Sequence, residues 1–300
     1  MAEDIIQRIE KLKREKNAVI LAHNYQPPHI QDIADMCGDS LELSIRASRT
    51  EAGIIVFCGV QFMAETASVL CPQKTVILPA EGAGCPMADM ITDIQLANWR
   101  KKSAGIPVIA YVNSSAAVKA LADICCTSAN SIKVAESLFA DEVLLVPDRN
   151  LARYTDANSA KSVHAWNGYC PYHERLSLET VERRRGQYPD ALFMAHPECR
   201  PEVLETADQV ASTSGMLAFA RSSEAKSFIV GTEVGLLHPL RKACPDKLFV
   251  AASERMECVD MKKISLEAVA ASLENLSGVV RVPEHVREPA MRAVQNMIEL

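Results

Sequence analysis

Three short apolar runs along the chain each end in a cluster of polar residues. The runs cover residues 18–26 (AVILAHNYQ), 108–115 (VIAYVNSS) and 192–199 (LFMAHPEC). A stretch with apolar residues at helical spacing precedes each run, as at Ile9 and Leu12 before the first. A helix followed by a short apolar strand is the pattern of an α/β fold with a parallel sheet.

A second pattern follows each of these runs. It consists of a polar turn, a helix pattern, an apolar strand and then an acidic residue. The matching segments are residues 57–81, 125–149 and 211–233, and their acidic residues are Glu81, Asp148 and Glu233. One pattern found three times indicates an internal threefold repeat.

Three cysteines occupy matching places on this repeat, since Cys85, Cys170 and Cys258 lie 85 and 88 residues apart. Seven residues after each cysteine comes a good helix N-cap, with an apolar residue before it and another four positions after it. These caps are Thr92, Ser177 and Ser265, and Gln95 completes a capping box in the first copy. An N-cap with this apolar pair around it (a hydrophobic staple) occurs at the same offset from a cysteine in three places. This predicts three equivalent domains.

We therefore expect an α/β protein of three similar three-layer domains, each with a short parallel sheet between helices. The repeat places them at residues 1–86, 87–172 and 173–300, related by pseudo-threefold symmetry around a central active site. The tail after Pro283 is predicted to form a closing helix in the last domain.

Equivalent cysteines of three related domains can meet on the axis. Three thiolates would leave a tetrahedral metal, or one corner of a [4Fe–4S] cube, open to substrate. Glycine before and proline after Cys85 and Cys170 favour exposed turns, whereas Cys258 lacks the glycine. The alternative is three buried packing residues, as we expect for the other seven cysteines. No two cysteines are spaced as CxxC, so the usual zinc-ribbon, thioredoxin and ferredoxin motifs are absent.

The strand ends supply candidate acids and bases, because ligands bind outside the carboxyl ends of parallel strands. The residues there are His23, Asn24 and Tyr25, then Tyr111, Val112 and Asn113, and then His196, Pro197 and Glu198. Histidine, tyrosine and glutamate are suited to proton transfer, and asparagine orients carbonyl or carboxylate groups. A single histidine at a strand end is often structural, but two at equivalent ends favour a function.

Hydroxyl-rich clusters begin three predicted helices, at residues 38–40, 127–130 and 212–215. Backbone N–H groups and a hydroxyl at a helix start form a site for a carboxylate or phosphate, although ordinary N-capping explains any single cluster. The chain contains neither GxGxxG nor GxxxxGK[ST], so a dinucleotide or nucleoside triphosphate is not indicated.

Composition narrows the classes of partner. The 32 Lys and Arg against 38 Asp and Glu give a net charge of −6, which argues against a nucleic-acid partner. Residues are 48% hydrophobic, yet no apolar run approaches the roughly 18 residues of a membrane helix. The charged first residues lack the apolar region of a signal peptide. We expect a cytoplasmic protein with no membrane partner, whose ten cysteines stay reduced.

Long motifs in a fixed order extend from about residue 18 to residue 275. They are AHNYQPPHIQDIADMCGDSLELS, FCGVQFMAETASVL, AGCPMADM, AYVNSSAAVKALADICCTSAN, GYCPYH, AHPECRPEVLETAD, STSGM and CVDMKKISLEAV. Through these motifs the chain resembles the quinolinate synthase family, the A protein of NAD biosynthesis. The resemblance implies three similar α/β domains and condensation of iminoaspartate (iminosuccinate) with dihydroxyacetone phosphate to quinolinate, phosphate and water. It also implies functional coupling to an aspartate-oxidising enzyme that supplies iminoaspartate.

The same resemblance assigns roles to residues of the matched motifs. It implies one [4Fe–4S] cluster on Cys85, Cys170 and Cys258, with one open iron as a Lewis acid. It implies proton transfer by Tyr25, His173, His196 and Glu198. It implies substrate contacts from His23, Ser40, Tyr111, Val112, Asn113, Ser128, His196, Pro197, Glu198 and Thr213.

Three other functions stay open at this point. An open cluster also dehydrates hydroxy acids, so a hydro-lyase of the aconitase type is one alternative. A non-catalytic cluster protein that senses oxygen or iron is the second. A metal-free binding protein for a small dicarboxylate is the third.

Overall fold

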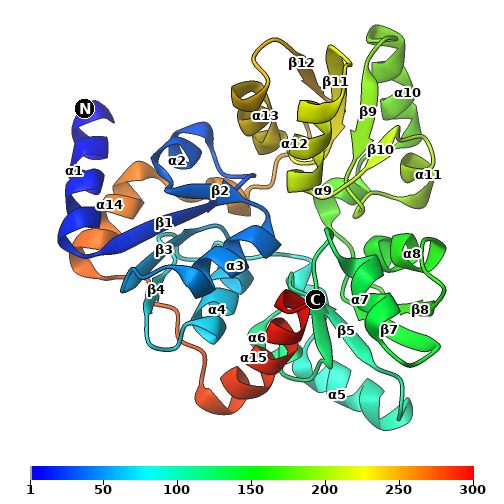
Figure 1. Ribbon diagram of the computed structural model, residues 1–300, viewed down its shortest axis with the longest axis horizontal. Coiled ribbons are helices and arrows are strands. Elements are labelled where there is room, and N and C mark those ends of the chain that lie inside the picture. The colour runs from blue at the N-terminus through cyan, green and yellow to red at the C-terminus, as the bar shows by residue number, and fades with distance from the viewer. Residues whose placement is uncertain (1) are drawn as a thin grey trace.

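The computed structural model describes residues 2–300 of the chain, with side chains from residue 4 onward. It contains three four-stranded sheets in which all strand pairs are parallel. Figure 1 shows them as three units arranged around a common centre.

The strands of the first unit are β1 (Ala18–His23), β2 (Met36–Gly38), β3 (Ile54–Cys58) and β4 (Thr75–Ile77). Those of the second are β5 (Val108–Tyr111), β6 (Ile124–Cys126), β7 (Glu142–Val146) and β8 (Ser162–Ala165). Those of the third are β9 (Leu192–Ala195), β10 (Gln209–Val210), β11 (Ser227–Gly231) and β12 (Leu248–Ala251).

All three sheets have the same strand order. The first strand of each unit lies between the second and third, and the fourth strand is at the edge beyond the third. The predicted runs form β1, β5 and β9, so the expected α/β fold with three similar parallel-sheet units is confirmed. Parallel neighbours require crossover connections, and helices supply them here.

Helices flank each sheet and account for most of the remaining chain. In the first unit they are α1 (Ala2–Glu15), α2 (Pro28–Ile33), α3 (Ser40–Arg49), α4 (Gln61–Leu70) and the 3₁₀ turn η1 (Ala88–Met90). In the second they are α5 (Asp93–Lys102), α6 (Ala116–Lys119), α7 (Ser131–Ser137), α8 (Arg149–Ala157) and α9 (Pro171–Glu174). The rest are α10 (Leu178–Gln187), α11 (Pro201–Leu204), α12 (Thr213–Ser222), η2 (Val234–Leu236), α13 (Leu237–Ala243), η3 (Asp260–Lys262), α14 (Leu266–Asn275) and α15 (Glu284–Ile298).

The three predicted N-caps begin helices as expected. Thr92, Ser177 and Ser265 each accept a hydrogen bond from the backbone N–H three residues further on. The first is a full capping box with Gln95. The apolar residues that flank each cap are buried, which fits the predicted staples.

The predicted match of the second pattern is wrong for the first unit. Residues 125–149 and 211–233 run from the second to the third strand of their units, whereas residues 57–81 run from β3 to β4. The strand register gives the correct counterparts, because Ala22 pairs with Cys58 as Ala110 pairs with Val146. Two residues beyond these third strands come Val60 and Asp148. Val60, not Glu81, is therefore the counterpart of Asp148 and Glu233.

The last two helices leave the third sheet and pack on the other units. Helix α14 lies against α1, and α15 lies against α4, α6 and β6 (Figure 1). The predicted range 173–300 thus includes the third sheet and two helices that tie the units together, and the three domain boundaries stay a prediction. None of the helices in the described part of the chain has the length and apolar character needed to cross a membrane.

The segment between α14 and α15 covers the exposed edge of the first sheet. Val279 pairs with Ile77 of β4 in an antiparallel bridge, and Leu78 donates its N–H to the carbonyl of Gly278 at 2.9 Å. Gly278 has a φ of 78°, and a Cβ atom there would collide with the carbonyl oxygen of Leu78. Only glycine fits this crossing without strain.

We predict that Gly278→Ala lowers the free energy of unfolding by about 1–3 kcal/mol, because the left-handed backbone and the close carbonyl both oppose a Cβ atom. Urea titration followed by circular dichroism measures the change. Gly186→Ala is the control, since Gly186 lies within α10 with open space around its Cβ position. It should stabilise by about 0.5–1 kcal/mol. Equal stability of Gly278→Ala and the wild type would contradict this account of the crossing.

Candidate active site

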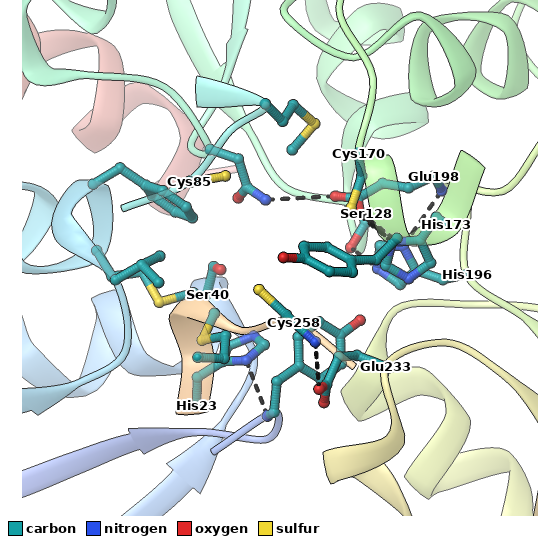
Figure 2. A pocket seen from close by; sticks show the side chains of 18 of the residues that line it. His23, Ser40, Cys85, Ser128, Cys170, His173, His196, Glu198, Glu233 and Cys258 are labelled. Atoms are coloured by element: carbon teal, nitrogen blue, oxygen red, sulfur yellow. Dashed lines mark hydrogen bonds and ion pairs between the residues drawn. The ribbon is translucent and has the colours of Figure 1, made fainter. Parts of the chain in front are cut away.

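The carboxyl ends of β1, β5 and β9 meet at one central cavity (Figure 2). The cavity contains about 750 Å³ of space between atoms, part of it open to solvent. The predicted site residues that line it are His23, Tyr25, Ser40, Cys85, Tyr111, Asn113, Ser128, Cys170, His173, His196, Glu198, Cys258 and Thr213. Val112 and Pro197 are not among its lining residues, so their substrate contacts remain a prediction.

Each of the three repeat cysteines directs its sulfur toward this cavity (Figure 2). Each also precedes a short helical turn, which is η1 for Cys85, α9 for Cys170 and η3 for Cys258. Backbone N–H groups two and three residues further on lie near each sulfur and act to lower its pKa. The three sulfurs thus have equivalent backbone donors, as the repeat predicts.

Burial dominates the protonation of these thiols when no cation is near. It raises the pKa of Cys85 to about 12 and that of Cys258 to about 11, and it raises the pKa of Cys170 well above its usual range. A bound metal cation reverses this preference, because a coordinating thiol is deprotonated. Three thiols with backbone donors near their sulfurs, facing one cavity, are suited to a metal that prefers thiolate ligands.

A tighter group of ligand atoms lies around Cys170. Its sulfur, a ring nitrogen of His173 and a carboxylate oxygen of Glu198 all lie within 4.8 Å of one another. The His173 Nδ1 atom is 3.1 Å from the Cys170 sulfur and 2.8 Å from Glu198 Oε2. The chain therefore has donor groups compatible with a metal cofactor at this cavity.

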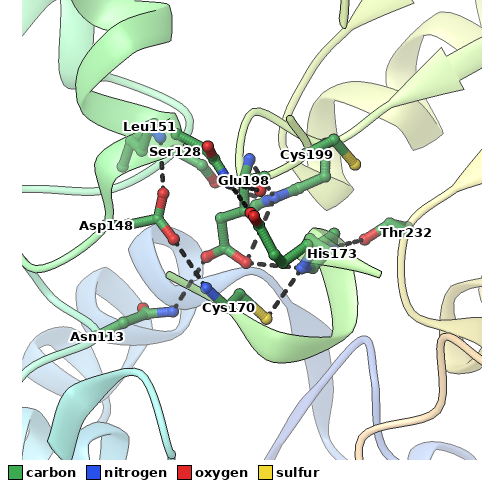
Figure 3. A network of polar contacts seen from close by, with 12 residues as sticks. Asn113, Ser128, Asp148, Leu151, Cys170, His173, Glu198, Cys199 and Thr232 are labelled. Atoms are coloured by element: carbon green, nitrogen blue, oxygen red, sulfur yellow. Dashed lines mark hydrogen bonds and ion pairs between the residues drawn. The ribbon is translucent and has the colours of Figure 1, made fainter. Parts of the chain in front are cut away.

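Glu198 is the centre of a buried polar network (Figure 3). The Tyr111 hydroxyl donates to its Oε1 atom at 2.7 Å, and the Asn113 amide donates to the same oxygen at 3.4 Å. Burial alone would raise the pKa of Glu198, but His173 and His196, with the hydrogen bonds from His173 and Tyr111, bring it down to about 2. Glu198 is an ionised proton acceptor at neutral pH.

The network continues from His173 to the third unit. His173 Nε2 lies 2.8 Å from the Thr232 hydroxyl, and that hydroxyl lies 2.5 Å from the Tyr25 hydroxyl. Tyr25, Thr232, His173 and Glu198 therefore form one continuous chain of hydrogen bonds that can move a proton across the cavity wall. Sequence reasoning missed Thr232. Its position directly after β11, at the carboxyl end of a strand, was the available signal.

His23 and His196 occupy equivalent positions and share one arrangement. The Nδ1 atom of each accepts the backbone N–H two residues further on, from Tyr25 and from Glu198. Burial, chiefly, lowers the pKa of both histidines to about 3, so both are neutral. With Nδ1 an acceptor, we assign the ring proton of each to Nε2. His196 Nε2 lies 3.1 Å from the Ser128 hydroxyl.

The hydroxyl-rich helix starts also reach the cavity. Ser40 is the first residue of α3, which Asp39 caps by accepting two backbone N–H groups. Thr213 is the first residue of α12, and its hydroxyl accepts a hydrogen bond from Asn24 at 3.0 Å. Ser128 lies shortly before α7. These hydroxyls bring donors from all three units to one ligand site.

The buried histidines predict a dependence of stability on pH. Their folded pKa of about 3 is below the ordinary value of 6.5, so between these values the unfolded chain binds protons that the folded chain does not. The thermal midpoint should fall as pH decreases from 7 to 5. His23→Asn and His196→Asn should each reduce that slope, whereas His285→Asn on the surface should not. If the thermal midpoints of the wild type and all three variants fall equally steeply as pH decreases, the low pKa assigned to His23 and His196 is refuted.

Comparison with known proteins places these features in a family. The family model described as "Quinolinate synthetase A protein" matches residues 7–299. The quinolinate synthase of Geobacter metallireducens is 53% identical over 299 residues, which cover 100% of this chain and 98% of that protein. The quinolinate synthase of Geotalea uraniireducens is 51% identical over 298 residues, 99% and 98% of the two chains.

A third relative gives the same result. The quinolinate synthase of Methanosarcina barkeri is 51% identical over 295 residues, which cover 98% of this chain and 97% of that protein. The similarity extends across all three units rather than over one of them. The chain therefore belongs to the quinolinate synthase family.

Proposed function

We propose that this chain condenses iminoaspartate with dihydroxyacetone phosphate to give quinolinate, phosphate and water. The reaction joins carbon to carbon with loss of phosphate, which makes the enzyme a transferase. The observation that carries the proposal is the convergence of one cysteine from each repeat on the cavity that also holds Glu198 and both strand-end histidines. Family membership supplies the reaction, and the geometry supplies residues suited to each part of it.

Cys85, Cys170 and Cys258 would hold a [4Fe–4S] cluster, one per chain. Each unit would contribute one thiolate ligand, and all three cysteines line the same cavity. When bound, the cluster supplies an open iron that acts as a Lewis acid on a hydroxyl, carboxylate or ring nitrogen of the substrate. Cys170 is adjacent to Glu198 through His173, so the metal site and the proton acceptor are neighbours.

Neutral hydrogen-bond donors are suited to holding the anionic groups of both substrates. The hydroxyls of Ser40, Ser128 and Thr213 lie at or near helix starts, where backbone N–H groups favour phosphate and carboxylate. The Nε2 proton that we assign to His23 provides another donor at the cavity. The Oδ1 atom of Asn113 is buried and has no hydrogen-bond partner among the residues that the structure describes, so it would accept a donor from the substrate.

Proton transfer would pass through the chain of hydrogen bonds from Glu198 to Tyr25. Glu198 is ionised and can take a proton during enolisation. His173 and Thr232 connect it to the Tyr25 hydroxyl, whose pKa burial raises well above its usual range, so Tyr25 stays protonated and can donate. One carboxylate and one phenol at opposite ends of a relay provide a base and an acid for dehydration.

Two parts of the proposal concern the cell. A cytoplasmic location would keep the ten cysteines reduced, as the proposed thiolate ligands require. Iminoaspartate would come from an enzyme that oxidises aspartate. Both statements remain predictions.

Replacement of Cys85, Cys170 or Cys258 by serine should each abolish the visible absorbance and the acid-labile sulfide of anaerobically purified protein, since serine is a far poorer ligand for this cluster. Iron and sulfide analysis measures the loss. Cys37→Ser is the control, because Cys37 is also half-buried but does not line the cavity. Full iron and sulfide in any one of the three ligand variants would exclude that cysteine as a ligand.

Glu198→Gln should leave iron and sulfide content unchanged and lower kcat by about 10²–10⁴-fold, because the amide keeps the shape but cannot accept a proton. Quinolinate and phosphate release are measured together, since a simple dehydratase would release no phosphate. Glu202→Gln, an exposed change four residues away, should behave as the wild type. A Glu198→Gln rate near that of the wild type would remove Glu198 from catalysis.

A further inference from the structure

A backbone hydrogen bond ties each cysteine loop to the helical turn that follows the third strand of its unit. In the second unit the N–H of Arg149 donates to the carbonyl of Gly168 at 2.8 Å, two residues before Cys170. In the third unit the N–H of Val234 donates to the carbonyl of Met256 at 2.9 Å, two residues before Cys258. The loops are therefore held at equivalent points.

The first unit has the same bond. The N–H of Gln61 donates to the carbonyl of Ala83 at 2.7 Å, two residues before Cys85. Gln61 follows Val60, just as Arg149 follows Asp148. This agreement confirms that Val60, Asp148 and Glu233 are structural counterparts.

The side chains at these three positions differ in a way that matters for the cysteines. Asp148 is fully buried, and its Oδ2 atom accepts the backbone N–H of Cys170 at 3.1 Å (Figure 3). Its Oδ1 atom accepts the N–H of Leu151 at 2.7 Å and caps α8. Both oxygens are used, and only one of them is needed for the cap.

Glu233 repeats this arrangement in the third unit. It is 1% exposed, its Oε1 atom accepts the backbone N–H of Cys258 at 3.0 Å, and its Oε2 atom accepts the N–H of Gly235 at 2.7 Å (Figure 2). Lys262 forms an ion pair with Oε1 at 2.8 Å. In the first unit the counterpart is the apolar Val60, which has no acceptor for the N–H of Cys85.

We infer that Asp148 and Glu233 are positioning residues of the metal site, which hold the main chain of Cys170 and Cys258 so that both sulfurs stay aimed at the cavity. The inference rests on the proposed cluster. A carboxylate is required because its two oxygens both accept, whereas an amide has one acceptor and would direct an NH₂ group at a second N–H. Groups that orient metal ligands without touching the metal typically change metal affinity by about 10–100-fold.

The test compares Asp148→Asn and Glu233→Gln with two controls. Glu81→Gln removes an exposed acid four residues from Cys85, and Ser177→Ala removes an N-cap seven residues after Cys170. Each full-length protein is loaded with ferrous iron and sulfide without oxygen. Iron and sulfide per chain, the decay of cluster absorbance in air and the thermal midpoint of the cluster-free protein are then measured.

We expect Asp148→Asn and Glu233→Gln to lose cluster absorbance about ten-fold faster than the wild type. Both controls should match the wild type in that rate, even though Ser177→Ala lowers the thermal midpoint. A wild-type rate in both carboxylate variants overturns the inference, and so does an equally fast loss in Ser177→Ala, which would show general destabilisation. If Asp148→Asn does not fold, the rate at which Glu233→Gln loses cluster absorbance tests the inference alone. Absence of iron and sulfide in the wild type would overturn the proposed cluster as well.

Discussion

One backbone hydrogen bond, made three times, fixes the geometry on which the site depends. In each unit the N–H of the residue after Val60, Asp148 or Glu233 donates to the carbonyl two residues before the cysteine. Because the three sheets share one strand order, this bond brings each sulfur to the same place relative to its own strand ends. The cavity lining then follows from the first strands, which deliver His23, Tyr111 and His196 beside those sulfurs.

Burial of the side chains around the cavity affects which of them are charged. Glu198 is already ionised there, both strand-end histidines are neutral, and the three thiols keep their protons unless a cation is bound. The proposed anionic substrates would therefore meet few positive side chains. Neutral donors such as the hydroxyls of Ser40 and Thr213, at the starts of α3 and α12, would have to satisfy their oxygens.

Much of this site could be predicted from the sequence because it repeats. The spacing of Cys85, Cys170 and Cys258, the caps that follow them and the polar strand ends were all visible as periodic features. The structure brings nearly all of these residues to one cavity. Residues without a repeated counterpart in the other units were harder to find. Thr232 is the clearest case, since its role depends on His173 and Tyr25 from other units.

Two further features had no reliable signal in the sequence. The match of residues 57–81 to the later repeats was one strand out of register, because helix and strand patterns alternate and a shift by one strand preserves both. The packing of α14 and α15 on the first two units is also a tertiary property, since the apolar face of a helix does not show which unit it will pack against. Exact symmetry is therefore a good guide to the strand ends and a poor one to the connections.

Anomalous X-ray scattering at the iron edge, from crystals of the wild-type protein grown without oxygen, tests the central claim most directly. The account predicts one compact iron peak in the central cavity, within bonding distance of the sulfurs of Cys85, Cys170 and Cys258. Iron bound elsewhere, or next to only one of these sulfurs, would contradict it.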